Sequence, residues 1–391
     1  MRIRSITAVA ALLLVAAAPV AGTSWTRAWT ASMWQGSGDQ VVTVENATIR
    51  SAVRIGAGGE RVRLRLANDY GPALALGGAT MRVAGGKAVR VTFGGEGSVQ
   101  IPAGAPLVSD PVALPVKAFD VVEVSLFLPG QARLETVHET GGQPTQISPP
   151  GDHSAEDFAP VSQSKMRPLI AGIDVLGGKQ RPVIVAYGDS ITDVGSCPND
   201  AVPICRWSEV LGRRLAKAGM PHVVVNQAIS GNRVLTPGAG PSALGRIDRD
   251  ILAMPGVTHI VLLEGVNDIG SSGVERNGVI RPVITAAQLI QGYRQLVQRA
   301  HERGIKVIAM TILPFEGAGY HSPEREAIRV EANRWIRSSG AFDAMIDMEK
   351  VVADPANPKR LAAALQTGDN LHPNGAGETK MGEAIDLRMF R

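Results

Sequence analysis

Four short and widely separated segments of the chain carry the residue types of acyl transfer. They contain Ser190, Gly231, Asn267, and Asp369 with His372. A serine hydroxyl such as that of Ser190 is a poor nucleophile unless a base lies within hydrogen-bond reach. His372 can be that base, and Asp369, three residues earlier, can hold the second imidazole nitrogen and so fix the tautomer. These residue types therefore predict a catalytic triad of Ser190, His372 and Asp369.

Acyl transfer also needs N–H donors aimed at the oxyanion of the tetrahedral intermediate. We expect the backbone amides of Ser190 and Gly231 and the side-chain amide of Asn267 to form this oxyanion hole. Each residue has a structural alternative: Ser190 as a helix N-cap, Gly231 as a turn glycine and Asn267 as part of an Asx turn. The presence of all four segments in one chain favours the catalytic interpretation.

Three further residues are candidate substrate contacts. Glu264 shortly precedes Asn267, His321 follows a predicted strand, and Trp207 begins a predicted helix. For each of them, ordinary packing or surface exposure is the alternative. The seven histidines of the chain form no metal-binding pattern and no H-E-x-x-H motif is present, so no metal site is expected.

The elements that would position these residues alternate between strands and helices in the second half of the chain. Residues 182–187 form a continuous apolar run, which is typical of a strand buried on both faces. We predict strands at 182–187, 222–226, 259–263, 306–313 and 342–346, and helices at 206–218, 285–303, 323–338 and 375–389. This alternation indicates a parallel sheet with helices on both faces and an active site at the carboxyl ends of the strands. All four segments fall at that edge.

The first half of the chain has a different hydrophobic pattern. Residues 61–66 (RVRLRL) alternate strictly between polar and apolar side chains, as a half-buried strand does, and 89–93 and 121–128 repeat the pattern. Gly- and Pro-rich turns separate these runs, which indicates an all-β sandwich domain of the jelly-roll kind. We place this β domain and its connection at 23–165, and the catalytic domain at 166–391.

One polar run in the first half has no obvious core role. It contains Thr136, His138 and Glu139. Either the run belongs to a plain connection or it packs against the second domain, and the sequence leaves both possibilities open.

The four segments, in this order, resemble those of the SGNH hydrolases, also called the GDSL esterase/lipase family. The matching positions are Ser190 in Gly-Asp-Ser, Gly231 in Ser-Gly-Asn, Asn267 in Gly-Val-Asn-Asp, and Asp369 and His372 in a D-x-x-H pattern. Ile191 stands where the family's nickname has Leu. The resemblance covers about 182–391 and implies a flavodoxin-like three-layer α/β/α sandwich, the triad and oxyanion hole given above, and no cofactor. The β domain is similar to one that precedes some secreted bacterial members.

The first 22 residues have the pattern of a secretory signal peptide. Arg2 and Arg4 precede an apolar run at 6–18, which is shorter than the roughly 20 residues that a membrane-spanning helix needs. A membrane anchor is the alternative. Export would place Cys197 and Cys205, the only cysteines, in an oxidising compartment where such a close pair forms a local disulfide, with two free thiols as the alternative. We therefore expect a secreted or periplasmic protein.

Composition and charge exclude several classes of protein. Hydrophobic residues make up 45% of the chain and charged residues 19%, which is typical of a globular protein and not of a disordered one. The net charge of +4 is small for 391 residues and no basic run is present, so nucleic acid is not an expected partner. No segment after the leader is long and apolar enough to span a membrane. The oligomeric state is not indicated.

The sequence therefore predicts a secreted serine esterase that hydrolyses short-chain O-acyl esters through an acyl-enzyme. A small-molecule or polysaccharide ester, such as an acetylated carbohydrate, is the expected substrate. The alternatives are a lipid or aryl ester hydrolase, an acyltransferase with the same triad, and a carbohydrate-binding protein whose hydrolase domain is inactive.

Overall fold

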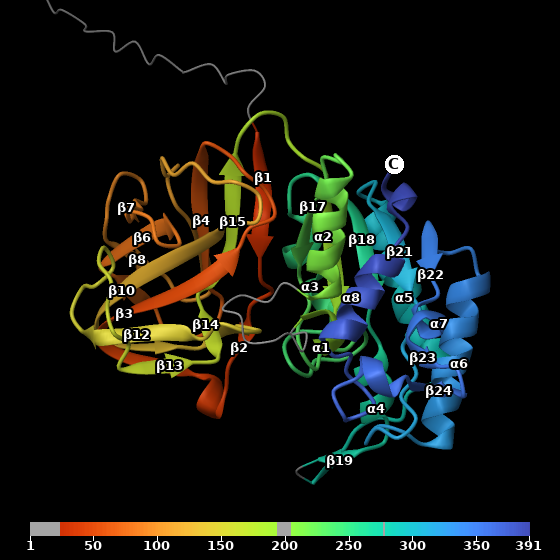
Figure 1. Ribbon diagram of the computed structural model, residues 1–391. Coiled ribbons are helices and arrows are strands. Elements are labelled where there is room, and N and C mark those ends of the chain that lie inside the picture. Colours follow the sequence, from red (N-terminus) through yellow and green to blue (C-terminus); the bar gives the residue numbers. More distant parts are fainter. Residues whose placement is uncertain (1–23, 194–204, 277) are drawn as a thin grey trace, which may run out of the picture.

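The computed structural model describes residues 24–193, 205–276 and 278–391. They form two domains that lie side by side, an all-β domain followed by a domain of parallel strands and helices (Figure 1). The predicted leader, 1–22, and Cys197 lie outside the described residues, so the signal peptide and the disulfide with Cys205 stay predictions. Within the described part of the chain, no helix has the length and apolar character needed to cross a membrane.

The β domain is built from short antiparallel strands. They are β1 (Trp25–Thr30), β2 (Trp34–Gln35), β3 (Val42–Arg54), β4 (Arg61–Asn68), β5 (Leu74–Leu76), β6 (Gly78–Val83), β7 (Val89–Arg90), β8 (Val99–Ile101), β9 (Ala105–Val108), β10 (Val121–Leu134), β11 (Thr136–Glu139), β12 (Thr145–Pro150), β13 (Ser162–Ser164), β14 (Met166–Pro168) and β15 (Ile170–Leu176), with a 3₁₀ turn, η1 (Gly38–Gln40). Their sheets have the orders β13-β12-β3-β10-β6-β7, β1-β15-β4-β9, β14-β11-β2 and β5-β8.

The alternation in the sequence explains how these sheets enclose a core. On β10, Val122 and Val124 are fully buried, whereas Glu123 between them points away from the core and is partly exposed. The strands predicted at 61–66 and 121–128 are confirmed as parts of β4 and β10. The domain is therefore the expected all-β sandwich.

The β domain extends further along the chain than the predicted boundary at 165/166. β15 pairs with both β1 and β4, and β14 pairs with β11. Because these strands complete two sheets of the β domain, the second domain begins after Leu176, and the predicted boundary was wrong. The stretch before residue 166 has the composition of a linker, yet it carries β12, which pairs with β3, and the edge strand β13.

The second domain alternates strands and helices. Its main strands are β16 (Val183–Gly188), β17 (Val223–Asn226), β18 (Val257–Leu263), β21 (Lys306–Met310) and β22 (Ala344–Ile346). Its helices are α1 (Ser190–Asp193), α2 (Trp207–Lys217), α3 (Ala243–Ile247), α4 (Val266–Ser271), α5 (Ala286–His301), α6 (Pro323–Ser338), α7 (Met348–Val352) and α8 (Gly375–Ala384). Smaller elements are the helical turns η2 (Asp248–Leu252), η3 (Ala363–Leu365) and η4 (Leu387–Phe390), and the strand pairs β19 (Glu275–Arg276) with β20 (Val279–Ile280) and β23 (Ala353–Asp354) with β24 (Asn357–Leu361).

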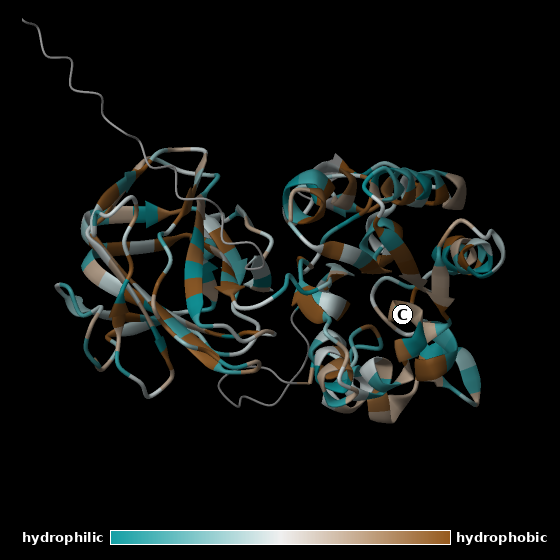
Figure 2. Ribbon diagram, turned by 90° about the horizontal axis from the view of Figure 1, so that it is seen from above, coloured by the Kyte–Doolittle hydropathy of each residue, from teal (hydrophilic) through white to brown (hydrophobic). Residues whose placement is uncertain are grey.

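The main sheet is parallel throughout, with the order β17-β16-β18-β21-β22. Helices lie on both sides of it, and the strands between them are largely hydrophobic (Figure 2). This confirms the predicted three-layer α/β/α sandwich, strand by strand. The chain passes from β16 to β17 on one side and then crosses to β18 on the other. In sheets of this order, ligands bind outside the carboxyl ends of the strands where the direction reverses.

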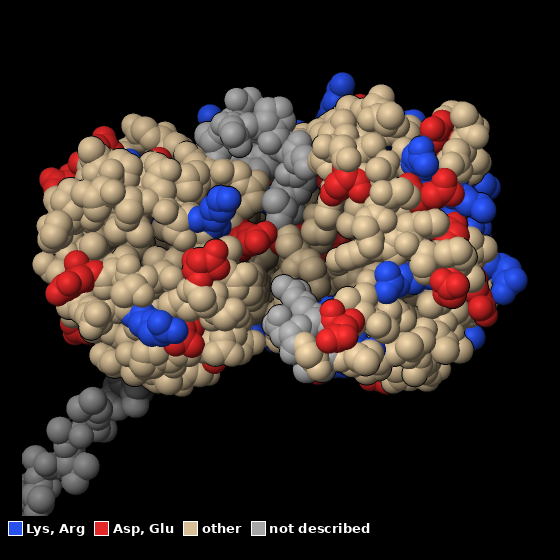
Figure 3. Space-filling model, turned by 90° about the horizontal axis from the view of Figure 1, so that it is seen from below, with Lys and Arg blue, Asp and Glu red and all other residues tan. Residues whose placement is uncertain are grey.

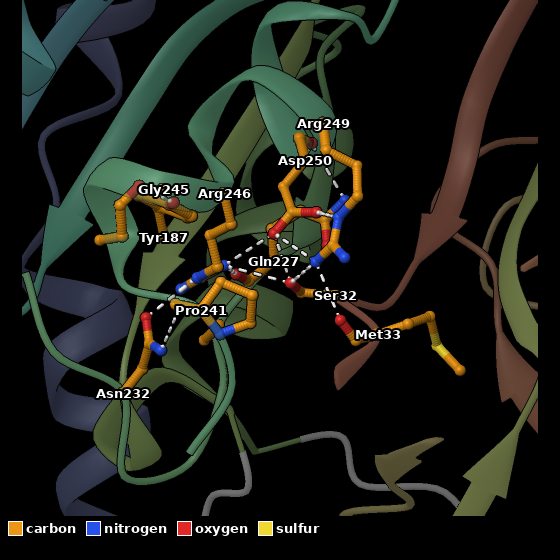
Figure 4. A network of polar contacts seen from close by, with 12 residues as sticks. Ser32, Met33, Tyr187, Gln227, Asn232, Pro241, Gly245, Arg246, Arg249 and Asp250 are labelled. Atoms are coloured by element: carbon orange, nitrogen blue, oxygen red, sulfur yellow. Dashed lines mark hydrogen bonds and ion pairs between the residues drawn. The ribbon is translucent and has the colours of Figure 1, made fainter. Parts of the chain in front are cut away.

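A buried polar network joins the two domains (Figure 4). At its centre, Arg246 of α3 is only 1% exposed and pairs with Asp250 at 3.1 Å. Its guanidinium also donates to Oδ1 of Asn232 (2.9 Å) and to the carbonyl oxygen of Gly188 (3.2 Å). Asp250 in turn accepts the hydroxyl of Ser32, which belongs to the β domain. One guanidinium therefore connects the β domain to the loops at the carboxyl ends of β16 and β17.

Candidate active site

Ser190 is the first residue of helix α1, at the turn that follows strand β16. The turn is tight at Gly188, where a Cβ atom would lie 2.3 Å from the carbonyl oxygen of Leu263. The next residue, Asp189, is buried, and its Oδ1 accepts the backbone amide of Ile191 at 3.0 Å. Burial raises the pKa of Asp189 to about 7. These contacts fix Ser190 at the carboxyl end of β16.

Ser190, His372 and Asp369 form a continuous chain of hydrogen bonds. Ser190 Oγ lies 2.8 Å from His372 Nε2, and His372 Nδ1 lies 2.6 Å from Asp369 Oδ2. The other carboxylate oxygen of Asp369 accepts the backbone amides of Leu371 and His372, both at 2.9 Å. The carboxylate is thus held against the edge of the imidazole, and the three residues predicted from the sequence lie together.

The hydrogen bonds around Asp369 determine which nitrogen of His372 can act as a base. Partial burial opposes ionisation, but the hydrogen bonds from His372 and Leu371 outweigh it and hold the pKa of Asp369 well below its ordinary value. Asp369 is therefore ionised at neutral pH. A carboxylate at Nδ1 requires a proton on that nitrogen, which leaves the lone pair of Nε2 free to accept the Ser190 proton.

Asn267 lies in the first turn of α4, directly after β18. Its Oδ1 accepts the hydroxyl of Tyr320 at 3.0 Å. Its Nδ2 is buried and has no acceptor among the described residues. A buried donor without an acceptor costs free energy unless a ligand supplies the acceptor. Nδ2 is therefore positioned to donate to a substrate oxygen, as the sequence predicts for an oxyanion hole.

Gly231 lies in the loop that follows β17. Its φ of +77° is in the left-handed region that favours glycine. The preceding residue, Ser230, donates its backbone amide and its hydroxyl to Oδ2 of Asp193, at 2.9 and 3.0 Å. Asp193 is the last residue of α1, the helix that Ser190 begins. This contact ties the loop of Gly231 to the nucleophile.

A second carboxylate holds the same loop from the other side. Asp268 of α4 accepts the backbone amides of Val234 and Leu235 at 2.8 and 3.0 Å. Burial raises the pKa of Asp268 to about 6, against the lowering effect of these two hydrogen bonds. Asp268 therefore positions backbone rather than substrate, although it is adjacent to Asn267.

Gly231 and Asn267 line one pocket of about 700 Å³. Its walls come from both domains and include Trp34, Gln35 and Gln40 of the β domain and Arg233, Arg281 and Tyr320 of the second domain. On this face of the molecule the two domains flank a hollow, and Lys and Arg side chains are scattered among Asp and Glu (Figure 3). Substrate at the oxyanion donors would therefore meet mainly polar side chains from both domains.

Two of the three expected substrate contacts belong to the core instead. Trp207 is fully buried, and its indole N–H donates to the hydroxyl of Thr192 at 3.3 Å. Glu264 is also buried, and its nearest cation is Arg246, with 3.9 Å between Oε2 and the guanidinium nitrogen. Burial raises the pKa of Glu264 well above its ordinary value. Neither side chain lines the pocket, so these two expectations are corrected.

The third expected contact, His321, lies next in sequence to a residue that does line the pocket. His321 packs its ring edge-on against Phe315, with 6.2 Å between ring centres, whereas Tyr320 lines the pocket and binds Asn267. Both residues follow β21 at the catalytic edge, so the sequence indicates the loop. Which of two adjacent side chains faces the pocket depends on the backbone of that loop, for which the sequence gives no signal.

The described side chains supply a nucleophile, a base with a fixed tautomer, and amide donors beside a pocket. Among the residues that the structure describes, no group of three or more His, Cys, Asp or Glu side chains is placed to hold a metal ion. The chemistry that these residues can perform is attack of the Ser190 oxygen on an acyl carbon.

Comparison with known proteins identifies the second domain. A family model described as GDSL-like Lipase/Acylhydrolase family matches residues 186–380. No curated protein matches the chain. The acetylxylan esterase Axe2 from Geobacillus stearothermophilus is similar at 21% sequence identity and a TM-score of 0.41, covering 53% of this chain and 93% of that one. The psychrotrophic esterase EstA from Pseudoalteromonas sp. is similar at 19% identity and a TM-score of 0.38, covering 52% of this chain and 93% of that one.

Proposed function

Because the second domain of this chain belongs to the GDSL-like lipase/acylhydrolase family, whose members are serine esterases and lipases, we propose that it hydrolyses short-chain O-acyl esters through an acyl-enzyme on Ser190. The observation that carries this proposal is the 2.8 Å contact between Ser190 Oγ and His372 Nε2, in line with the contact from His372 to Asp369. A serine that is only a helix cap has no need of an imidazole on its hydroxyl.

The proposed reaction has two halves. The Ser190 oxygen attacks the acyl carbon while its proton passes to Nε2 of His372, and the amides of Ser190, Gly231 and Asn267 receive the negative charge that develops on the carbonyl oxygen. The intermediate collapses to an acyl-enzyme, and the alcohol leaves with the proton from Nε2. Water then attacks the acyl carbon, again losing a proton to His372, and the carboxylic acid leaves as the Ser190 hydroxyl is restored.

We propose a carbohydrate as the alcohol part of the ester. The pocket beside the oxyanion donors offers amide and guanidinium groups, among them Gln35, Gln40 and Arg281, to a polyhydroxylated ligand. Its size, about 700 Å³, is that of a pocket that encloses a small molecule or one end of a polymer. Gly231 and Ala239, which have small side chains or none, leave room for an acetyl group next to the donors.

Replacement of Ser190 tests the reaction. Ser190→Ala is expected to lower turnover of p-nitrophenyl acetate to background, a loss on the order of 10⁶-fold, because the rest of the triad is useless without the nucleophile. The matched control is Ser271→Ala, which removes a hydroxyl from the wall of the same pocket and should retain activity within about threefold of wild type. Wild-type turnover in the Ser190→Ala protein would refute the proposed function.

A specific feature favours a second substrate class, esters of longer acyl chains. Ile280 and Val283 are 69% and 73% exposed, and they flank Arg281 and Pro282 in the pocket wall. Exposed apolar side chains at the mouth of a pocket can hold an acyl chain. A series of p-nitrophenyl esters from acetate to decanoate, run beside acetylated xylan, separates the two classes. The carbohydrate proposal expects kcat/KM to fall as the chain lengthens, whereas a lipid esterase would show the opposite trend.

A further inference from the structure

His138 carries a polar contact from the β domain to the nucleophile helix. It lies on β11 and is buried, with 5% of the residue exposed. Its Nδ1 lies 2.9 Å from the carbonyl oxygen of Ser32, and its Nε2 lies 3.0 Å from Oδ1 of Asp193 in the second domain. The polar run whose role the sequence left open therefore packs against the second domain.

Both ring nitrogens of His138 face acceptors. A carbonyl oxygen has no proton to donate, and Asp193 is ionised. Burial opposes the ionisation of Asp193, but the charge and hydrogen bond of His138 and the charge of Arg206 outweigh it and hold the pKa of Asp193 below its ordinary value. The contact is therefore a buried, charge-assisted hydrogen bond, and removing one partner of such a pair leaves the other uncompensated.

Asp193 extends this contact to the oxyanion loop. Its Oδ1 faces His138, and its Oδ2 accepts both the backbone amide and the hydroxyl of Ser230. The peptide between Ser230 and Gly231 carries the amide that is expected to bind the oxyanion. A series of hydrogen bonds thus leads from β11 to Ser230, whose carbonyl group forms the peptide with the amide of Gly231.

We propose that His138 is a positioning residue of the esterase, which orients Asp193 so that Asp193 holds the Ser230–Gly231 peptide at the distance from Ser190 that the oxyanion requires. This role rests on the function proposed above and deepens it. It makes the β domain part of the catalytic machinery, because the hole is aligned from outside the domain that contains the triad.

A role in domain adhesion alone would have different consequences. Loss of an adhesive contact lowers stability but leaves kcat of the folded protein unchanged. Two partial mimics of His138 separate the roles. The amide nitrogen of glutamine reaches the position of Nε2 and keeps a donor for Asp193, whereas that of asparagine reaches only to Nδ1 and keeps a donor for Ser32.

The experiment compares His138→Gln with His138→Asn on p-nitrophenyl acetate, at a temperature where circular dichroism shows both to be folded. In His138→Asn, kcat is expected to fall about tenfold or more, towards the roughly 10²–10³-fold effect of a lost oxyanion donor, with KM changed by less than about threefold. His138→Gln should recover most of this loss. The control is Asp69→Asn, which removes the charge from the ion pair of Asp69 with Arg249 (3.1 Å), also between the domains, and should keep kcat within about twofold of wild type.

A second measurement does not depend on turnover. Hydrogen–deuterium exchange in the loop after β17 should rise in His138→Asn and stay near the wild-type level in His138→Gln. Equal kcat and equal exchange in the two variants would overturn the positioning role. The proposed function would still stand in that case, provided that the wild type cleaves the ester. A wild type that cleaves no ester would instead remove the proposed function, and the exchange data would still decide whether His138 holds the loop.

Discussion

Asn267 shows how a single amide can be given a direction. Its oxygen accepts the Tyr320 hydroxyl, and its nitrogen is buried without an acceptor among the described residues. An amide turned by half a revolution would present its oxygen to the substrate and would repel an oxyanion. In the structure the Tyr320 hydroxyl donates to Oδ1, and this contact favours the orientation in which the nitrogen faces the pocket.

The different roles of Asn267 and Tyr320 predict losses of kcat that differ in size between their variants. Asn267→Ala is expected to lower kcat by about 10²–10³-fold, because an oxyanion donor is lost. Asn267→Asp, which keeps the shape but offers only oxygens, should be at least as severe. Tyr320→Phe leaves the donor in place but unconstrained, and a loss of about tenfold is expected. Steady-state kinetics on p-nitrophenyl acetate check the order, and a Tyr320→Phe variant as impaired as Asn267→Ala would show that Tyr320 contacts the reacting atoms itself.

At the residue scale, residues that the chemistry requires could be predicted from the sequence. Residues whose role depends on the orientation of a side chain could not. Ser190, Asp369 and His372 could be predicted because acyl transfer needs those residue types, and the strand order brings their segments to one edge. Tyr320 and His138 act through the direction of a side chain in the folded protein, which no spacing in the sequence records. The misplaced expectation for Trp207 has the same cause, since a tryptophan at helical spacing fits a core as well as a pocket.

At the scale of elements, helices α2 and α8 are joined by a buried carboxyl. Glu378 of α8 is 1% exposed, and its Oε2 accepts the backbone amide of Trp207 at the start of α2, at 2.8 Å. Burial raises the pKa of Glu378 from 4.5 to about 8, which exceeds the lowering effect of that hydrogen bond. The packing of the two helices therefore favours the protonated carboxyl.

The raised pKa of Glu378 predicts a pH-dependent stability. The folded protein holds this proton up to about pH 8, while the unfolded chain releases it near pH 4.5, so stability is full at low pH and declines across this interval. Glu378→Gln keeps an acceptor for Trp207 without the ionisation. It should melt near the wild-type temperature at pH 5 and at a higher temperature at pH 8. Glu383→Gln, an exposed position on the same helix, is the control and should follow the wild type at both pH values. A constant difference between Glu378→Gln and wild type would contradict the shift.

The elements themselves were largely accessible from the sequence, for physical reasons that differ between the domains. Strands such as 182–187 are buried on both faces and therefore read as continuous apolar runs, and the helices between them have long apolar faces. The strands from β12 to β15 were not predicted in this way. β13 is a short edge strand that buries little, so its segment has the composition of a linker; β14 and β15, which follow it, were missed as well, and for this reason the domain boundary was placed too early.

At the scale of the whole molecule, the two domains share a network that neither could satisfy alone. Arg246 donates to Asp250, Asn232 and the carbonyl oxygen of Gly188, and the hydroxyl of Ser32 in the β domain also donates to Asp250. Figure 4 shows Arg246, Asp250, Asn232 and Ser32 together. A guanidinium so deeply buried is stable only while its partners remain in place. We therefore expect the domains to unfold together, as one cooperative unit.

Arg246→Met tests this coupling, because it removes the charge at the centre of the network and leaves Asp250 with less compensation. Loss of one partner from a buried pair typically costs about 3–5 kcal/mol, so a marked fall in melting temperature is expected. Calorimetry should show one transition in the wild type and two overlapping transitions in the variant, as the β domain and the second domain separate. Arg299→Met is the control, because it removes an ion pair with the exposed Asp248, worth only about 0–1 kcal/mol, and a hydrogen bond to the carbonyl oxygen of Leu244, both within the second domain, and it should keep the single transition. Two separate transitions in the wild type would show instead that the network does not join the domains energetically, and the role of His138 would then have to be purely local.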